Sequence, residues 1–403
     1  MTAEWQTHAE AWRRPEQIVA QWADAESVDP SLLVARIRGD WWDVLRERGV
    51  TLLVTREYEH IVAAAGVADG SPRLSFLPLP HPSGIAVAER GSVVVASTRN
   101  PNQLFRLEPV VEVGENARDD LTDTTMPQGT LMPLESRVLP GSLYLHDLAF
   151  IGDSLYGNAV GQNAIVSLSR GRSPDRVWWP ACIDSSHGPH FERNYLQLNS
   201  IAAGPSLESS YFSASTDHIG RRRPGHRNFP VDHRGVIFSG STREPVVRGL
   251  TRPHSARLHG DRLWLNNSGY GEVGFVRAGV LEPVAYLPGW TRGLCFVDDL
   301  AFVGTSRVIP EYQNYAPGLD LDSSICGVHA LDTKTGRVIA SLLWPAGNQI
   351  FAVEAVPAAV SPGLPFEARR RTRARERRLF SSFSTLAPRR PLGGLPDVDP
   401  DGN

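Results

Sequence analysis

Residues 145–156 read Leu-His-Asp-Leu-Ala-Phe-Ile-Gly-Asp-Ser-Leu-Tyr: a short alternating apolar run, a Gly-Asp turn and a second apolar run. This pattern is typical of a β-hairpin, here with polar or small residues near the start of its first strand. Five further segments open in the same way, the last in a degenerate form: residues 81–87, 198–203, 253–258, 291–296 and 350–355. The chain therefore contains an internal repeat.

The repeat predicts an all-β fold, a six-bladed β-propeller. Successive openings lie roughly 40 to 60 residues apart, which suits one four-stranded blade plus loops. A seventh blade within residues 205–245 is also possible. A β-sandwich with several hairpins is the alternative fold, but it explains six aligned openings less well. The last opening lacks a following hairpin, so residues 50–54 and 61–65 are expected to complete its sheet and close the ring.

The chain divides into three regions by composition. Residues 1–48 have apolar side chains at helical spacing, with a break at Asp29-Pro30-Ser31, and predict an N-terminal helical cap. Residues 49–357 have the strand-and-turn pattern and hold the propeller. Residues 358–403 are rich in Pro, Gly and Arg and predict a disordered basic tail.

Composition favours a globular protein without a membrane span. Hydrophobic residues make up 41% and charged residues 21% of the chain, and no apolar run approaches the roughly 20 residues of a span. Without a signal-like segment we expect a cytoplasmic protein. The net charge is −3 and the tail is basic, so the body is acidic, which argues against nucleic-acid binding there. The widely spaced Cys182, Cys295 and Cys326 indicate buried thiols.

The candidate functional site is the channel, because the first strand of every propeller blade lines it. Aligning the openings places six residues in one ring around the axis: Ser83, His146, Asn199, His254, Arg292 and Phe351. His81, two residues before Ser83, is expected one layer above this ring. Asp147, beside His146, is expected to orient an imidazole or act as a base.

Three interpretations of these histidines stay open. His81, His146 and His254 could ligate a divalent transition metal such as zinc, iron or copper, because imidazole nitrogens suit such ions and leave a position for water or substrate. Without a metal, the same groups form an acid–base pair around an anion held by Arg292. The third interpretation is that the histidines are hydrogen-bonded plugs that hold the blades together.

Two loop regions are further candidates. The histidine-rich segment 185–233, with Arg221-Arg222-Arg223, is either a solvated loop or a lid for an acidic or phosphorylated ligand. The long aromatic segment 308–322 either closes over the channel mouth or is an exposed loop without catalytic consequence. The arginines of the tail are expected to be solvated, with electrostatic binding of nucleic acid or anionic lipid as the alternative.

Several motifs carry a resemblance to a known family across residues of about 40 to 357. They are Trp41-Trp42, Pro82-Ser83-Gly84, His146-Asp147-Leu148-Ala149, Asn158 with Gly161-Gln162-Asn163, Arg252-Pro253-His254-Ser255 and Asn266-Asn267-Ser268-Gly269. The chain resembles an uncharacterised bacterial family that carries a domain-of-unknown-function label. More loosely, it is similar to six-bladed propellers of the gluconolactonase and peptide-amidating lyase kind, which implies a metal on the axis. Their Glu/Asn/Asp calcium set is not recognisable here.

Together these observations predict a metal-dependent enzyme acting on a small molecule or modified peptide at the central channel. His81, His146 and His254 are the predicted ligands, and Asp147, Arg292 and Asn199 are the predicted catalytic residues. The alternative is a non-catalytic propeller that binds a protein partner or ligand through its face and the 308–322 segment.

Overall fold

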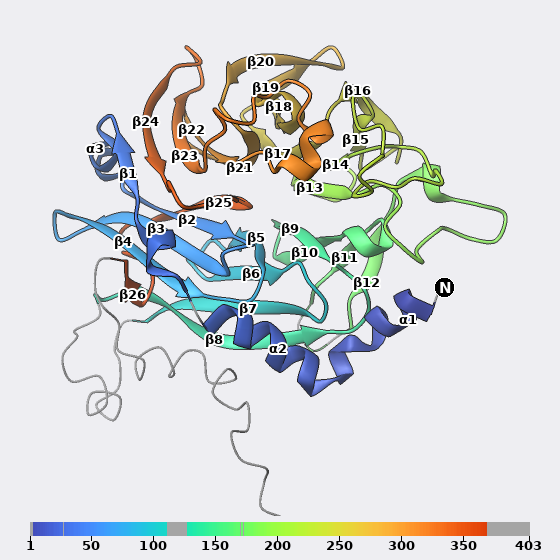
Figure 1. The fold of residues 1–403 in the computed structure, drawn as a ribbon, viewed down its shortest axis with the longest axis horizontal. Coiled ribbons are helices and arrows are strands. Elements are labelled where there is room, and N and C mark those ends of the chain that lie inside the picture. The colour runs from blue at the N-terminus through green and yellow to red at the C-terminus, as the bar shows by residue number, and fades with distance from the viewer. Residues whose placement is uncertain (1–2, 27, 111–126, 170, 172, 369–403) are drawn as a thin grey trace, which may run out of the picture.

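The six predicted openings are the innermost strands of six antiparallel sheets arranged around a central axis (Figure 1). The computed structural model describes residues 3–26, 28–110, 127–169, 171 and 173–368, and the number of sheets refers to these residues. The predicted six-bladed propeller is therefore confirmed. Of the predicted tail, residues 358–403, the part from residue 369 onward lies outside the described residues.

The first three blades follow the chain from the inside outward. Blade 1 consists of β5 (Pro82–Val87), β6 (Val93–Ser97), β7 (Asn102–Val110) and β8 (Thr130–Leu139). Blade 2 consists of β9 (Leu145–Ile151), β10 (Ser154–Ala159), β11 (Ala164–Ser167) and β12 (Asp175–Trp178). Blade 3 consists of β13 (Leu198–Ala202), β14 (Tyr211–Ala214), β15 (Gly235–Ser239) and β16 (Pro245–Leu250). Residues 205–245 thus supply strands to blade 3, and no seventh blade forms within the described part of the chain.

The last three blades include strands from both ends of the propeller. Blade 4 consists of β17 (Pro253–His259), β18 (Arg262–Asn267), β19 (Glu272–Arg277) and β20 (Val280–Tyr286). Blade 5 consists of β21 (Trp290–Val297), β22 (Leu300–Ser306), β23 (Gly327–Asp332), β24 (Val338–Leu343) and the outer β1 (Arg36–Arg38). Blade 6 consists of β25 (Ala352–Pro357), β2 (Val50–Arg56), β3 (Ile61–Ala68), β4 (Ser71–Pro78) and the outer β26 (Phe366–Glu367).

Blade 6 closes the ring as the sequence predicts. Its innermost strand β25 comes from the C-terminal side and pairs with β2, from Thr55 opposite Ala352 to Val50 opposite Pro357. The innermost strands then contact one another in one complete circle, β5, β9, β13, β17, β21, β25 and back to β5. Closure removes the two exposed edges that an open array of blades would leave.

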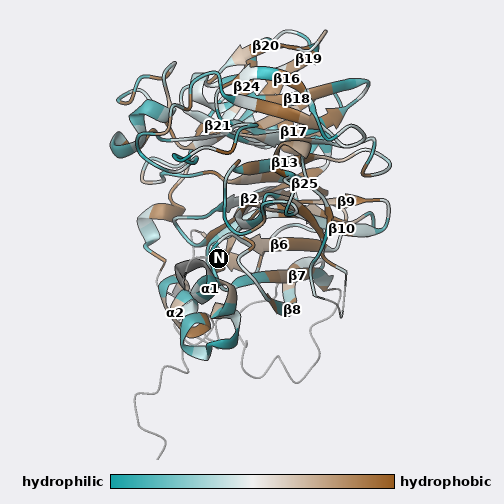
Figure 2. Cartoon of the chain, turned by 90° about the vertical axis from the view of Figure 1, so that its right-hand side faces the viewer, coloured by the Kyte–Doolittle hydropathy of each residue, from teal (hydrophilic) through white to brown (hydrophobic). Residues whose placement is uncertain are grey.

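Apolar side chains fill the space between neighbouring blades. In one cluster, Ala86 and Val94 of blade 1 pack with Leu145 and Val166 of blade 2. Figure 2 shows the strands largely in the hydrophobic colour, whereas many loops and much of the N-terminal helices are hydrophilic. Hydrophobic strands and hydrophilic loops fit sheets that bury both faces against the neighbouring blades.

The hairpins within the blades form where the sequence predicts them. Ile151 pairs with Ser154 across Gly152-Asp153, and His259 pairs with Arg262 across Gly260-Asp261. Only the first turn residue has a left-handed φ, 57° for Gly152 and 61° for Gly260. A type I′ turn needs a left-handed φ at both residues, so these two turns are not of that type.

The N-terminal region is helical only in part. Its helices are α1 (Ala3–Glu10), α2 (Pro15–Glu26) and α3 (Trp41–Arg48), with the short 3-10 helices η1 (Ala11–Arg13) and η2 (Pro30–Leu33). The side chain of Asp29 accepts a hydrogen bond from the Ser31 amide and caps η2 as predicted. Ile37 has helical spacing in the sequence but lies in β1, opposite Leu342, because pairing satisfies the otherwise open edge of β24.

Short 3-10 helices occupy the remaining connections: η3 (Val160–Gln162), η4 (Ala181–Ile183), η5 (Ser268–Tyr270) and η6 (Pro310–Tyr315). No helix among the described residues is long and apolar enough to cross a membrane. The ordered chain continues past Pro357 to β26, which pairs with β4.

A polar side chain ties each blade to the next near the axis. Thr55 is the one at the closure: its hydroxyl donates to the Ser83 carbonyl of blade 1 and accepts from the Ala352 amide, at 2.6 and 2.9 Å. The remaining blade junctions are bridged by Ser83 to Leu145, Asp147 to Ile201, Ser200 to Ala256, Ser255 to Gly293 and Ser306 to Ile350.

The Thr55→Val variant is expected to lose about 2–4 kcal/mol of unfolding free energy, because it leaves the buried Ala352 amide and Ser83 carbonyl short of one partner each. Urea unfolding monitored by circular dichroism measures this loss. Thr335→Val, at an exposed turn threonine, is the matched control and should change stability little. Equal stability of the two variants would show that the closure does not depend on this hydroxyl.

Candidate functional site

The backbone bends sharply where each innermost strand enters the channel. The residue just before five of these strands has a left-handed φ between 45° and 148°: His81, Tyr144, Gln197, Arg252 and Gly289. The pairing register then shifts in the hairpin that follows, for example between His254 and Arg257. Such bends and bulges re-aim side chains, and here they turn the start of each strand toward the axis.

Two layers of side chains line a pocket of about 400 Å³ at one mouth of the channel. The first layer holds four residues of the predicted ring: His146, His254, Arg292 and Phe351. The second layer lies two residues upstream in each strand entry: Tyr144, Gln197, Arg252, Trp290 and Gln349. The volume falls within the usual range for small-molecule sites.

His254 presents a hydrogen-bond acceptor to this pocket. Its Nδ1 lies 2.8 Å from the carbonyl oxygen of Arg252, which can only accept, so Nδ1 carries the hydrogen of the neutral ring. Its Nε2 is buried and has no hydrogen-bond partner among the described residues. Burial, and then the charge of Arg292, hold the pKa of His254 well below its usual value, so the imidazole is neutral at pH 7.

His146 is neutral for the same reasons. Burial, followed by the charge of Arg292, holds its pKa well below the usual value. Its ring meets the edge of Phe351 at a centroid distance of 5.3 Å, and the Arg292 guanidinium lies 3.3 Å from the centroid of that same ring. Its Nδ1 is buried without a hydrogen-bond partner in the described part of the chain.

Arg252 and Arg292 are partly buried positive charges that form no ion pair with a carboxylate among the described residues. No carboxylate lies within ion-pair distance of either guanidinium among the described residues, and Arg252 Nε and Arg292 Nη2 have no hydrogen-bond partner there. Arg252 lies 4.7 Å from the ring of Trp290, which fixes its position. Burial, and then the charge of Arg252, lower the pKa of Arg292. Two desolvated guanidiniums favour an anionic ligand.

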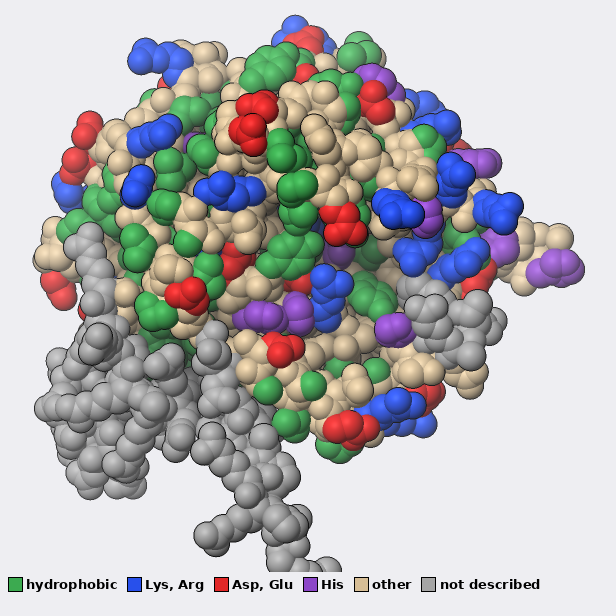
Figure 3. Space-filling model, in the orientation of Figure 1, with side chains coloured by type: hydrophobic (Ala, Val, Ile, Leu, Met, Phe, Trp, Pro, Cys, Tyr) green, Lys and Arg blue, Asp and Glu red, His purple; other side chains and the backbone are tan. Residues whose placement is uncertain are grey.

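The remaining lining adds positive charge and polar groups. Arg99 is neutralised by Glu57, whose carboxylate accepts from Arg99 Nε at 3.1 Å. Arg307 donates to the backbone carbonyls of Gly347 and Pro345. Figure 3 shows histidine and Lys or Arg side chains gathered near the middle of the visible face. Arginines thus outnumber carboxylates in this lining: Arg99, Arg223, Arg252, Arg292 and Arg307 against Glu57.

Both candidate loop regions contribute walls. Arg223 and Gly225 of the histidine-rich segment line the pocket, as do Ile309, Tyr312 and Tyr315 of the 308–322 segment. The Tyr315 hydroxyl accepts from the Gly225 amide and donates to the His226 carbonyl, so it joins the two loops. Of the alternatives left open by the sequence, closure over the channel mouth is the one this arrangement favours.

Four predicted site residues lie outside the lining: Ser83, Asn199, His81 and Asp147. Ser83 donates to backbone carbonyls of its own and the next blade, and the Asn199 amide donates to the Pro253 carbonyl at 3.0 Å. His81 is held by Glu57, with Nδ1 3.0 Å from a carboxylate oxygen. Although burial works to raise the pKa of Glu57, His81 and Arg99 outweigh it and lower that pKa. The contacts of Ser83 and His81 join structural elements, whereas Asn199 also forms a side-chain hydrogen bond with His146 of the pocket.

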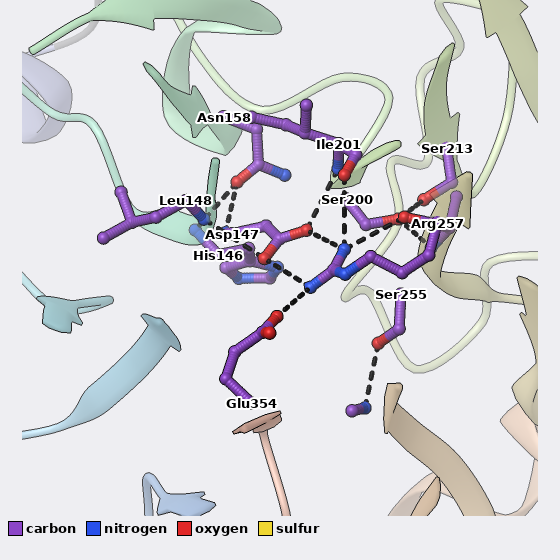
Figure 4. A network of polar contacts seen from close by, with 12 residues as sticks. His146, Asp147, Leu148, Asn158, Ser200, Ile201, Ser213, Ser255, Arg257 and Glu354 are labelled. Carbon is purple, nitrogen blue, oxygen red and sulfur yellow. Dashed lines mark hydrogen bonds and ion pairs between the residues drawn. The ribbon is translucent and has the colours of Figure 1, made fainter. Parts of the chain in front are cut away.

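Asp147 lies in a buried ion cluster that spans three blades (Figure 4). Its carboxylate accepts from Arg257 at 2.8 and 3.2 Å, and Arg257 also donates to Glu354 at 3.2 Å. Asp147 additionally accepts from the Ile201 amide. Its carboxylate oxygens are thus engaged by Arg257 and by the neighbouring blade, and among the described residues none of their hydrogen bonds reaches His146.

The residues present do not fit a transition-metal site. No group of three or more His, Cys, Asp and Glu side chains that could hold a metal ion occurs in the described parts of the chain. His146 and His254 alone reach the pocket from the predicted ligand set, and both lie near the positive charge of Arg292. A divalent cation there would be repelled, and it would lack the third protein ligand of a catalytic zinc site.

The sequence contained a signal for the lining residues that were not predicted. Side chains two residues apart in a strand point to the same side, so the layer assigned to His81 has counterparts in the other openings. Those counterparts are Tyr144, Gln197, Arg252, Trp290 and Gln349. All five line the pocket, whereas His81 itself does not. Contributions from loops, such as Tyr58, carry no such periodic signal.

Comparisons with known proteins leave the activity open. A family model described as a domain of unknown function (DUF4915) matches residues 39–364, which confirms the resemblance to an uncharacterised family. No curated protein matches the chain.

Among solved structures, similarity extends to chains of several different proteins. The nidogen/laminin complex contains a chain with TM-score 0.49 and 9% identity, covering 76% of this chain and 98% of that one. A gluconolactonase from Xanthomonas campestris has TM-score 0.40 and 13% identity, covering 74% and 86%. Virginiamycin B lyase from Staphylococcus aureus has TM-score 0.36 and 15% identity, covering 63% and 73%. Likenesses of this size say nothing about activity.

The Glu354→Gln variant should remove one component of the pH dependence of stability. Burial raises the pKa of Glu354 from 4.5 to about 7 in the folded chain. The pKa of Glu354 is higher in the folded state than in the unfolded state. Its contribution to the free energy of unfolding is therefore fully present below pH 4.5 and is lost as the pH rises through about 7. Relative to the variant, the wild type should lose about 3 kcal/mol between pH 4.5 and pH 8.

Urea unfolding at pH 4.5, 6 and 8 measures this difference. Glu89→Gln, at an exposed turn residue, is the control and should leave the pH dependence as it is. A wild type and a Glu354→Gln variant with the same pH dependence would contradict the assignment.

Proposed function

The chain belongs to the DUF4915 family, a domain of unknown function, and we propose that it is a metal-independent enzyme that transfers protons on a small organic anion at the channel mouth. Arg252 and Arg292 bind the anionic group, and His254 exchanges the proton. This is the acid–base alternative of the sequence analysis, with Arg252 added to Arg292. The anion is a carboxylate or a group of similar charge.

The observation that carries this proposal is the pair of partly buried guanidiniums that form no ion pair within the described residues. A buried, unpaired charge costs several kcal/mol, and a protein normally neutralises it with an opposite charge. Here other arginines of the lining are engaged by Glu57 or by backbone carbonyls, while Arg252 Nε and Arg292 Nη2 stay without partners within the described residues. A bound anion would supply the missing charge and the missing acceptors.

The neutral imidazoles fit a role in proton transfer. His254 Nε2 bears the lone pair, because Nδ1–H is directed to the Arg252 carbonyl. An anion on Arg292 offsets the positive charge that lowers the pKa of His254, so the imidazole becomes a stronger base once the ligand is bound. The same guanidiniums stabilise negative charge that develops when a proton leaves the carbon next to a carboxylate.

The alternative of a partner-binding propeller has less support. A partner surface on the 308–322 segment calls for exposed aromatic side chains there. Tyr312 and Tyr315 instead line the pocket and pack in a cluster with Trp290 and Phe229. Within the described chain, no large exposed hydrophobic residue lies in that segment.

Substitution of Arg292 by Met should weaken anion binding by about 30-fold or more, because a desolvated charge partner is lost while the length of the side chain is kept. Titration calorimetry with acetate, lactate, pyruvate, succinate and inorganic phosphate as probes measures the affinity. Arg277→Met, at an exposed arginine paired with Glu282, is the matched control. Equal affinity of Arg292→Met and wild type would contradict the anion site.

Substitution of His254 by Gln should abolish proton transfer and keep anion binding. Incubation with the bound carboxylates in D₂O, followed by NMR, measures deuterium uptake at the carbon next to the carboxylate. We expect uptake with wild type and none above background with the variant. Binding without uptake in the wild type would indicate a non-catalytic anion-binding protein.

Elemental analysis of the purified protein separates this proposal from a metal-dependent enzyme. We expect no stoichiometric transition metal and no effect of a chelator on deuterium uptake. A stoichiometric metal that disappears in the His146→Ala/His254→Ala double variant would instead support the metal-dependent enzyme predicted from the sequence.

A further inference from the structure

We propose that the N-terminal helix α1 supplies one wall of this pocket and that His8 limits the length of the ligand. The proposal rests on the proposed function only in taking the pocket to bind an anion. It makes His8 a specificity-determining residue that lies outside the part of the chain matched by the family model, residues 39–364.

The helix α1 is attached to the loops that border the pocket. The side-chain amide of Asn100 donates to the His8 carbonyl at 3.0 Å, and the Gly141 amide donates to the Ala9 carbonyl at 3.2 Å. Asn100 follows β6, and Gly141 precedes β9. The helix therefore bridges the β6–β7 loop of blade 1 and the entry loop of blade 2.

The rest of the N-terminal segment anchors this arrangement. Trp22 of α2 is buried and packs edge-on against Phe105 of blade 1, with ring centroids 5.6 Å apart. Ala11 and Ala25 are buried as well. Since these contacts hold the segment independently of the pocket, a substitution at His8 should leave the attachment of the helices intact.

The side chain of His8 completes a polar wall. Its Nδ1 lies 3.2 Å from the Tyr144 hydroxyl, and both residues line the pocket together with His146. Tyr144 lies two residues before His146, in the second layer of the pocket lining. A ligand whose charged group binds Arg292 and whose body extends past His146 therefore meets Tyr144 and His8 next.

This position decides which anions fit. Short carboxylates need only the arginines and the imidazoles, so they should be indifferent to His8. Longer carboxylates reach the wall, where a histidine held by Tyr144 and by the anchored helix cannot move aside without loss of its contacts. We therefore expect a length limit set by the volume of residue 8.

A series of linear carboxylates from acetate to decanoate tests the proposal by titration calorimetry. In wild type the affinity should rise with chain length and then fall at a limiting length. His8→Ala should move this limit to longer acids and His8→Trp to shorter ones. Gln6→Ala, at an exposed residue of the same helix, is the matched control and should leave the limit in place. One common limit in all four proteins would overturn the proposal.

A second measurement does not need a ligand. In a Cys182→Ser background, which removes the one native cysteine that is not buried, Thr98→Cys places a thiol in the pocket lining. Its rate of maleimide labelling should rise severalfold with His8→Ala and stay the same with Gln6→Ala. Equal rates would overturn the wall, whether or not a carboxylate binds. If maleimide labelling becomes faster with His8→Ala as expected but no carboxylate binds, only the proposed function is contradicted.

Discussion

Ring closure is the constraint on which the rest of the structure depends. Six sheets can share one axis only if the last sheet completes itself with strands from the start of the propeller, and β25 does so by pairing with β2. At this junction Thr55 satisfies the amide of one strand and the carbonyl of the next blade. Equivalent polar bridges at the other junctions keep the innermost strands in register, so the channel has a defined shape.

Along the axis, the polar groups that hold the blades together lie apart from the polar groups that line the pocket. In one layer, Asp147, Arg257 and Glu354 neutralise one another across three blades, and their oxygens and nitrogens are largely engaged. At the pocket, Arg252 and Arg292 have no such partners within the described residues. The same chemical groups therefore have opposite consequences: a closed ion cluster stabilises contacts between blades, whereas an open pair of charges favours a ligand.

Electrostatics links the residues of the pocket into one unit. Burial and the charge of Arg292 keep His146 and His254 neutral, and the carbonyl of Arg252 selects the tautomer of His254. An anion would reverse the charge effect and leave the tautomer unchanged. The guanidinium of Arg292 thus couples the binding of an anion to the basicity of His254. A metal cation in the pocket would instead be repelled by the arginines.

The sequence by itself determined the six blades, the closure by residues 50–54 and 61–65, and the ring positions of His146, His254, Arg292 and Phe351, because strand periodicity and turn residues are local signals. Tertiary structure alone decided which polar residues remain free for a ligand. Asp147 and Asn199 have hydrogen-bond partners more than 50 positions away in the chain, Arg257 and Pro253, which no local pattern indicates. His8 reached the pocket through packing of helices whose sequence gives no hint of their location. Charge compensation and burial depend on contacts between distant segments, which no local pattern contains.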